Sequence, residues 1–134
     1  MPWTNKLLHN KLLDRGEDAF IDINPVEITD PHVAKLWGEA QHLVLRLDPQ
    51  LAAIRRLLLR PDVPISGSND GYSNTALRAM IARESGIFYA LVWHGILTNR
   101  INDPVVAVAW TKAHKLGVAY RAVYENVQAW LESD

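Results

Sequence analysis

The chain of 134 residues contains no cysteine, and it has no apolar run long enough to cross a bilayer. Without cysteine, disulfides, thiolate catalysis and cysteine-ligated zinc are excluded. The most apolar segment, residues 86–97, is much shorter than the roughly 20 residues that a membrane-spanning helix needs. The N-terminus also lacks the apolar stretch of a signal peptide. We therefore expect a soluble cytoplasmic protein that does not associate with membranes.

Motifs that mark common catalytic and ligand-binding sites are missing as well. No two of the five histidines stand four residues apart, the spacing that places two metal ligands on one helical face. The chain has no Gly-x-Ser-x-Gly turn and no Gly-rich loop before a Lys-Ser or Lys-Thr pair. From the sequence we assign no catalytic residue, no metal and no cofactor.

Charge of one sign is not in excess, because the net charge is only −1. This balance argues against nucleic acid as a partner. The charge is nevertheless uneven: residues 1–30 carry three basic and six acidic side chains, whereas residues 31–60 carry five basic and two acidic ones. The asymmetry is compatible with a solvated surface, with a head-to-tail contact within the chain or with an acidic partner.

Three Asp-Pro dipeptides, at 30–31, 48–49 and 103–104, each precede an apolar run with helical spacing. An Asp side chain accepts hydrogen bonds from the N–H groups of a helix's first turn, and proline at the first helical position lacks an N–H that would have no partner there. The dipeptides therefore predict helices over residues 31–47, 49–59 and 104–132. The alternative for the last helix is a division into two pieces at Gly117.

Weaker signals predict the remaining elements. Thr4 can cap a short helix that ends before Gly16, and Ser73 or Asn74 can cap a long central helix over residues 75–99. Residues 20–28 alternate loosely between apolar and polar types, which indicates an extended strap or a short edge strand. The sequence thus predicts an all-α fold, a compact bundle of about five helices with an extended N-terminal strap, in a single domain over residues 1–134.

The long irregular segment from Arg60 to Asn74 and its neighbouring arginines form the candidate binding surface. Loops of this length inside compact domains are uncommon and are often functional. Arginine and tyrosine are enriched at binding hot spots, although these arginines are equally compatible with solvation. The candidate binding residues are Arg55, Arg56, Arg60, Asn69, Asp70 and Tyr72.

A helix-turn-helix pattern lies within residues 81–96, where Ala82, Gly86, Ile87 and Val92 stand at the characteristic offsets. A helix that reads a DNA groove needs Arg, Lys, Asn or Gln side chains. Residues 88–93 supply aromatic and aliphatic side chains instead. The pattern favours a buried helix over a DNA-binding one.

Glu84-Ser85-Gly86 resembles a motif of the lytic transglycosylases, in which a Glu beside Ser and Gly is the general acid. The resemblance implies glycan cleavage by Glu84, but it covers only these residues, and the Met-Gln stretch expected downstream is absent. We expect instead a structural Glu84 paired with an arginine, and a buried, hydrogen-bonded His94.

Abundant apolar and aromatic residues without a convergent polar site favour protein binding over catalysis. We expect a non-enzymatic adaptor, regulator or inhibitor, of a size common in bacterial and phage genomes. It would bind a protein partner through a helical surface, and a homo-oligomer is compatible with the same composition. The alternatives are a DNA-binding regulator that uses residues 81–96 and a small glycan-cleaving enzyme that uses Glu84.

Overall fold

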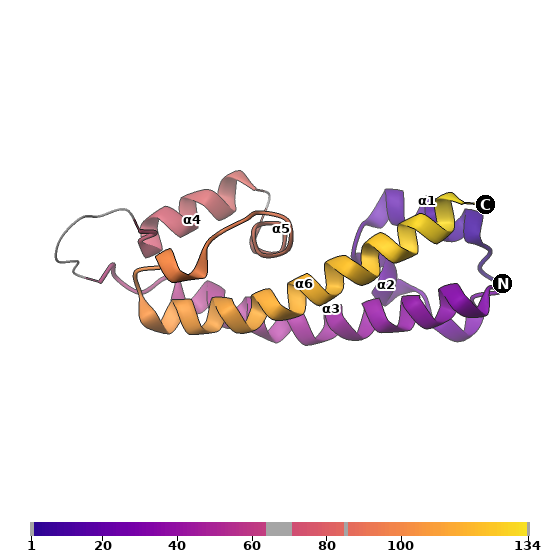
Figure 1. Cartoon of the computed structure of the whole chain (residues 1–134), viewed down its shortest axis with the longest axis horizontal. Helices are drawn as coiled ribbons and strands as arrows, with labels where there is room; N and C mark the ends of the chain where they lie inside the picture. The colour runs from indigo at the N-terminus through magenta and orange to yellow at the C-terminus, as the bar shows by residue number, and fades with distance from the viewer. Residues whose placement is uncertain (1, 64–70, 85, 134) are drawn as a thin grey trace. The chain divides into compact units, whose positions relative to one another are not determined.

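The computed structural model describes residues 2–63, 71–84 and 86–133, and this part of the chain is all-α (Figure 1). Helices account for 76% of the described residues, and these residues form no sheet, which confirms the predicted fold class. No helix in the described ranges combines the length and the apolar character needed to span a membrane. The α-helices are α1 (Asn5–Arg15), α2 (Asp18–Asp22), α3 (Pro31–Leu57), α4 (Asn74–Arg83), α5 (Ile87–Val92) and α6 (Pro104–Glu132).

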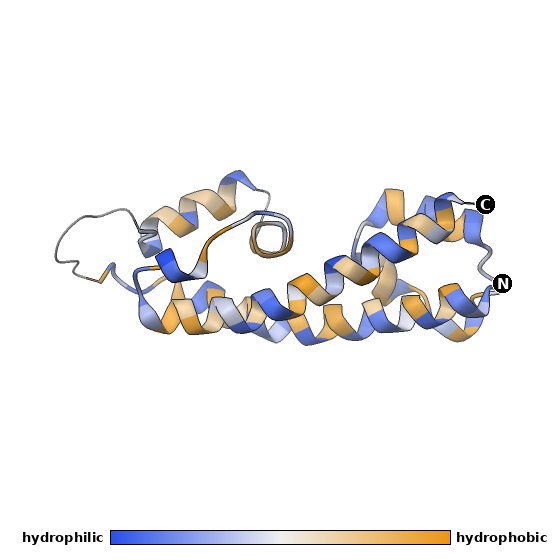
Figure 2. Ribbon diagram, viewed as in Figure 1, coloured by the Kyte–Doolittle hydropathy of each residue, from blue (hydrophilic) through white to orange (hydrophobic). Residues whose placement is uncertain are grey.

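The chain divides into two compact units, and each has its own buried core. Unit 1 consists of residues 1–46 and 119–134, and unit 2 consists of residues 47–118. Helices α3 and α6 contribute residues to both units. Apolar and polar residues interleave along both helices, as Figure 2 shows, which is the pattern of helices with one buried face.

Two of the Asp-Pro dipeptides begin helices as predicted. The Asp30 side chain accepts a hydrogen bond from the N–H of His32 at 2.9 Å, at the start of α3. Asp103 accepts one from the N–H of Val105 at 3.0 Å, at the start of α6. Helix α6 then runs through Gly117 without a break. In both cases a side-chain acceptor satisfies a first-turn donor that would otherwise be unpaired.

The predicted caps of two other helices are also confirmed. The hydroxyl of Thr4 accepts from the N–H of Leu7 at 3.4 Å at the start of α1, which ends at Gly16. The hydroxyl of Ser73 accepts from the N–H of Ala76 at 3.0 Å at the start of α4.

The prediction from the third dipeptide is wrong, because Pro49 lies inside the continuous helix α3. A proline in a helix interior removes one backbone hydrogen bond and clashes with the carbonyl four residues earlier. Here the buried face continues on both sides of Pro49 at helical spacing, so apolar packing outweighs this local cost. The buried side chains of that face are Val44, Leu47, Leu51, Ile54 and Leu58.

The extended strap and edge strand predicted over residues 20–28 are also wrong. Residues 20–22 belong to α2, and Pro25–Glu27 form a 3₁₀ turn. Phe20 and Ile23 are both buried and stand three residues apart, which is a helical spacing rather than alternation. Only Ile28 forms a β-bridge in this segment, with Trp3.

The long central helix predicted over residues 75–99 is divided into α4 and α5. Gly86, between them, has φ +121°, a conformation that L-residues with side chains rarely adopt. The apolar run that follows Gly86 hid this break in the sequence, because α5 is buried along most of its length. The result is two separate helices in unit 2, α4 and α5, as Figure 1 shows.

The core of unit 1 is an aromatic cluster. The ring of Phe20 lies 4.5 Å from that of Trp37 and 5.9 Å from that of Tyr120, measured between centroids. Tyr124 borders the cluster, with its ring 6.1 Å from that of Phe20. Burial raises the pKa of the Tyr120 phenol far above its ordinary value, and the carboxylate of Glu17 adds to the shift. The cluster ties α2 to the first part of α3 and the last part of α6.

The core of unit 2 joins α4 and α5 to parts of α3 and α6. Its fully buried side chains include Ile54, Leu77, Ile87, Leu91 and Trp110.

A backbone bridge between Tyr72 and Ile101 links the segments before α4 and α6. A Cβ on Gly71 would lie 2.7 Å from the carbonyl oxygen of Arg100, so this close approach requires glycine.

Candidate functional site

The residues predicted for the binding surface occupy different places in unit 2. Arg55 and Arg56 lie exposed on the last turn of α3, and Arg60 follows that helix. Tyr72 precedes α4 and is partly buried. Asn69 and Asp70 fall outside the described residues.

A pocket of about 330 Å³ lies where the end of α3 meets α4. Its lining is mixed, because two guanidinium groups accompany three aliphatic side chains. Leu59 is notable, since 75% of its surface is exposed although it is a large apolar residue. The lining residues are Arg55, Leu58, Leu59, Arg78 and Ile81.

Arg78 is held in place at the pocket. Its Nη1 donates to the carbonyl oxygen of Leu58, and its Nη2 donates to the hydroxyl of Thr75 at 3.2 Å. A side chain fixed by two hydrogen bonds loses less conformational entropy when a partner binds than a freely rotating one. The positive charge of Arg78 is therefore preorganised in the pocket wall.

Asp62 supports this arrangement from the other side of Thr75. The Thr75 hydroxyl donates to one Asp62 carboxylate oxygen at 2.7 Å, and its backbone N–H donates to the other at 3.0 Å. These hydrogen bonds, with the nearby charge of Arg78, hold the pKa of the Asp62 carboxyl below its ordinary value. Arg78, Thr75 and Asp62 thus form a chain of polar contacts at the start of α4.

Arg60 is not among the residues that line the pocket. Its guanidinium pairs instead with the buried carboxylate of Asp103 at 3.7 Å. The same carboxylate oxygen accepts a hydrogen bond from the Asn74 side chain at 3.2 Å. Burial alone would raise the pKa of Asp103, but the hydrogen bonds from Asn74 and Val105 and the charge of Arg60 outweigh it and lower the pKa. Arg60 is part of the scaffold that joins α3, α4 and α6.

Tyr72 also has a structural partner. Its backbone pairs with residues 100 and 102, and its ring faces the guanidinium of Arg100 at 5.3 Å from the centroid. Among the predicted residues that the structure describes, only Arg55 lines the pocket.

Sequence reasoning missed Arg78 and Ile81, because helical periodicity does not show which neighbouring helix a face will meet. The spacing of Arg78 and Ile81, three residues apart, places them on one helical face, and this was the available signal. The spacing alone does not place these two side chains in the pocket, because that also requires α4 to pack against the end of α3.

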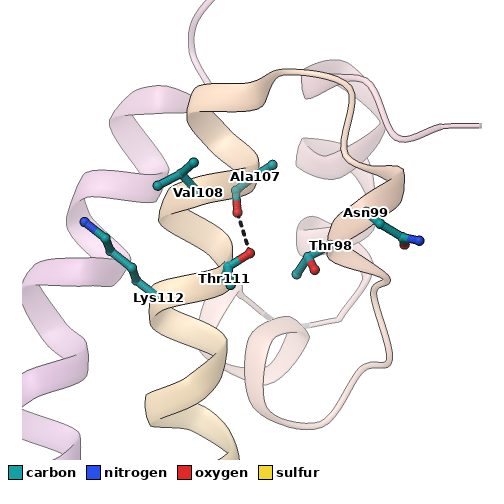
Figure 3. A pocket seen from close by; sticks show the side chains of 6 residues that line it. All are labelled: Thr98, Asn99, Ala107, Val108, Thr111 and Lys112. Carbon is teal, nitrogen blue, oxygen red and sulfur yellow. Dashed lines mark hydrogen bonds between the residues drawn. The ribbon is translucent and has the colours of Figure 1, made fainter.

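A second cavity, of about 360 Å³, lies between the 3₁₀ turn Thr98–Arg100 and the first part of α6 (Figure 3). In its wall the Thr111 hydroxyl donates to the carbonyl oxygen of Ala107 at 2.8 Å, as the dashed line in Figure 3 marks. Thr98, Asn99 and Lys112 supply the other polar groups. Among the described lining residues of this cavity, Lys112 alone carries a charge.

Glu84 is paired with a histidine and not with an arginine, which corrects the sequence-based expectation. Its carboxylate oxygen Oε1 lies 3.4 Å from Nδ1 of His94. His94 is also not buried in a core, because 36% of its side chain is exposed. The pair links the end of α4 to the segment that follows α5.

The helix-turn-helix pattern over residues 81–96 corresponds to α4, the turn and α5, but α5 is unsuited to read DNA. It spans only Ile87–Val92, and four of its six residues are buried. Tyr89 is its one exposed large side chain. No basic or amide side chain on α5 is available to contact base edges.

Within the described ranges, no three His, Asp or Glu side chains are grouped closely enough to hold a metal ion. Comparison of the chain with protein-family models, with curated proteins and with solved structures finds no match.

Proposed function

We propose that this chain is a non-enzymatic, cytoplasmic protein-binding module, an adaptor, regulator or inhibitor. Its pocket between the end of α3 and α4 receives an acidic segment of a protein partner. The observation that supports this proposal is the combination of two arginines, Arg55 and Arg78, with an aliphatic floor in one pocket. Such a pocket fits an apolar side chain that stands next to a carboxylate.

The chemistry of the lining favours a protein segment over a small polar ligand. Leu58, Leu59 and Ile81 offer aliphatic contact, which a partner's apolar side chain would cover. The Arg55 guanidinium can form paired hydrogen bonds with a carboxylate, and Arg78, whose Nη1 and Nη2 already donate to Leu58 and Thr75, adds its positive charge. Arginine is enriched at binding hot spots, so we expect Arg55 and Arg78 to contribute most of the binding free energy.

The experiment is a selection of short random peptides, displayed on phage, against the immobilised full chain. We expect enrichment of peptides in which Asp or Glu adjoins a Val, Ile or Leu residue. Arg55→Glu should abolish the enrichment, because it reverses one of the two positive charges of the pocket.

Arg83→Glu is the matched control. Both arginines lie in the last turn of a helix in unit 2, but only Arg55 lines the pocket. Equal effects of the two substitutions, or no enrichment of acidic peptides, would overturn the proposal. Retention of the chain on duplex DNA, lost equally in both variants, would instead indicate a nucleic-acid surface.

A further inference from the structure

The two units carry opposite net charges. Unit 1 contains six Lys and Arg against ten Asp and Glu residues, whereas unit 2 contains eight against five. Opposite charge on two parts of one chain favours contact between unit 1 of one copy and unit 2 of another. This complementarity favours the acidic unit 1 of a second copy as the partner of the basic pocket in unit 2.

Unit 1 presents an apolar side chain beside a carboxylate, at Val26 and Glu27. Among the described large apolar residues Val26 is the most exposed, at 84%. Glu27 follows it directly and is also exposed. An exposed aliphatic group with an adjoining carboxylate is the chemistry that the pocket at Arg55 and Arg78 fits.

The backbone that carries Val26 is fixed on both sides. The Asn24 side chain accepts from the N–H of Val26 at 3.2 Å, and the carbonyl oxygen of Glu27 accepts from the N–H of Trp3 at 2.7 Å. The 3₁₀ turn Pro25–Glu27 is closed by a hydrogen bond from the N–H of Ile28 to the carbonyl oxygen of Pro25 at 3.1 Å. A turn held in this way loses little backbone freedom on binding.

Other acidic and apolar neighbours in unit 1 are less suited. Asp22, beside the exposed Ile21, already forms an ion pair with Arg15 at 3.2 Å. Leu13 and Asp14 are exposed, but they lie on the surface of helix α1 and not on a turn.

From these observations we propose that the pocket at Arg55 and Arg78 of one copy receives Val26 and Glu27 of a second copy. The inference rests on the proposed function and names the partner as this chain itself. Each copy then carries one turn and one pocket, so that the association is head to tail and continues from copy to copy.

Sedimentation equilibrium of the full chain at low and high salt tests this inference. We expect the average mass of the wild type to rise with protein concentration, and to rise less at high salt because charge attraction is screened. Val26→Lys and Arg55→Glu should each lower the association constant at least about tenfold, since each removes an anchor of the contact. Leu13→Lys and Arg83→Glu are the matched controls and should change it less than about twofold.

An equimolar mixture of the two damaged variants gives the sharpest outcome. The Val26→Lys chain keeps an intact pocket and the Arg55→Glu chain keeps an intact turn, so the mixture should form a dimer with one copy of each and nothing larger. A mixture that stays monomeric while the wild type associates would overturn the inference. Equal effects of Leu13→Lys and Val26→Lys would overturn it too.

The failure of this inference is distinguishable from the failure of the proposed function. If the wild type stays monomeric but selects acidic peptides through Arg55, only the claim that the partner is a second copy is overturned. A monomeric wild type that selects no peptide overturns both. All four substitutions are at exposed positions, and circular dichroism would verify that each variant keeps its helical content.

Discussion

The side chain of Asn74 donates a hydrogen bond to the buried carboxylate of Asp103 across 3.2 Å, and thereby joins the start of α4 to the start of α6. Asp103 also caps α6 through the N–H of Val105. The Asp103 carboxylate thus accepts hydrogen bonds both from a helix terminus and from the NH₂ group of a buried amide. Arg60, which follows α3, pairs with the same carboxylate, so Asp103 contacts residues at the end of α3 and at the start of α4.

Replacement of Asp103 by Ala should lower the free energy of unfolding by about 2–3 kcal/mol, because a helix cap is lost and the buried Asn74 amide loses its shortest hydrogen bond. The amide keeps only the longer ones to the carbonyl oxygens of Arg60 and Pro61. Asp48→Ala is the control, since Asp48 is exposed inside α3. It should change stability by less than about 0.5 kcal/mol. Urea unfolding measures both, and equal losses would contradict the assignment of Asp103.

Stability should fall as the solution is acidified below about pH 4. The pKa values of Asp30, Asp62 and Asp103 are lower in the folded chain than the ordinary value of 3.8. A group whose pKa is lower in the folded state stabilises the fold at pH values above its unfolded-state pKa. This contribution is lost as the pH drops through its folded-state pKa. Urea unfolding from pH 7 to pH 3 checks the slope. Asp103→Asn should reduce the slope, and an unchanged slope in this variant would contradict the role of Asp103.

Pro49→Ala should stabilise the chain by about 1–3 kcal/mol, because it restores a hydrogen bond within α3 and removes a steric clash. If Pro49 instead began a separate helix, proline would suit its first position and the substitution would bring no gain. Thermal unfolding followed by circular dichroism distinguishes a continuous α3 from two helices.

Gly86→Ala should destabilise the chain by about 1–3 kcal/mol, because φ +121° is strained for a residue with a Cβ. Gly95→Ala is the control: a Cβ there meets no atom within 4 Å, and Gly95 does not have a positive φ. Its stability should stay the same or rise by up to about 1 kcal/mol. A continuous helix through residue 86 would reverse the result for Gly86→Ala, since alanine favours helix.

Local signals predicted the parts of the fold that local chemistry determines. Thr4, Asp30, Ser73 and Asp103 accept hydrogen bonds from N–H groups only two or three residues away, so their spacing in the sequence was sufficient. At Pro49 the same type of signal failed, because the buried face of α3 continues through it and depends on side chains distant in sequence.

The candidate site was less accessible to sequence reasoning. Arg55 was identified because arginines gather near the end of α3, but Arg78 comes from another helix and its fixed position depends on Leu58 and Thr75. Arg60 has the same sequence character as Arg55, yet it pairs with Asp103. Only the packing of α4 against the end of α3 separates an arginine of the pocket from one of the scaffold.

The central claim, an acidic partner segment in the pocket at Arg55, is tested most directly by a charge exchange. A peptide enriched in the display selection is prepared with its Glu and with Lys in its place, and the affinity of each is measured for the wild type and for Arg55→Glu by fluorescence anisotropy. We predict that the wild type prefers the Glu peptide by about tenfold, or about 1.4 kcal/mol, and that Arg55→Glu prefers the Lys peptide. An unchanged preference for the Glu peptide in Arg55→Glu would contradict the account.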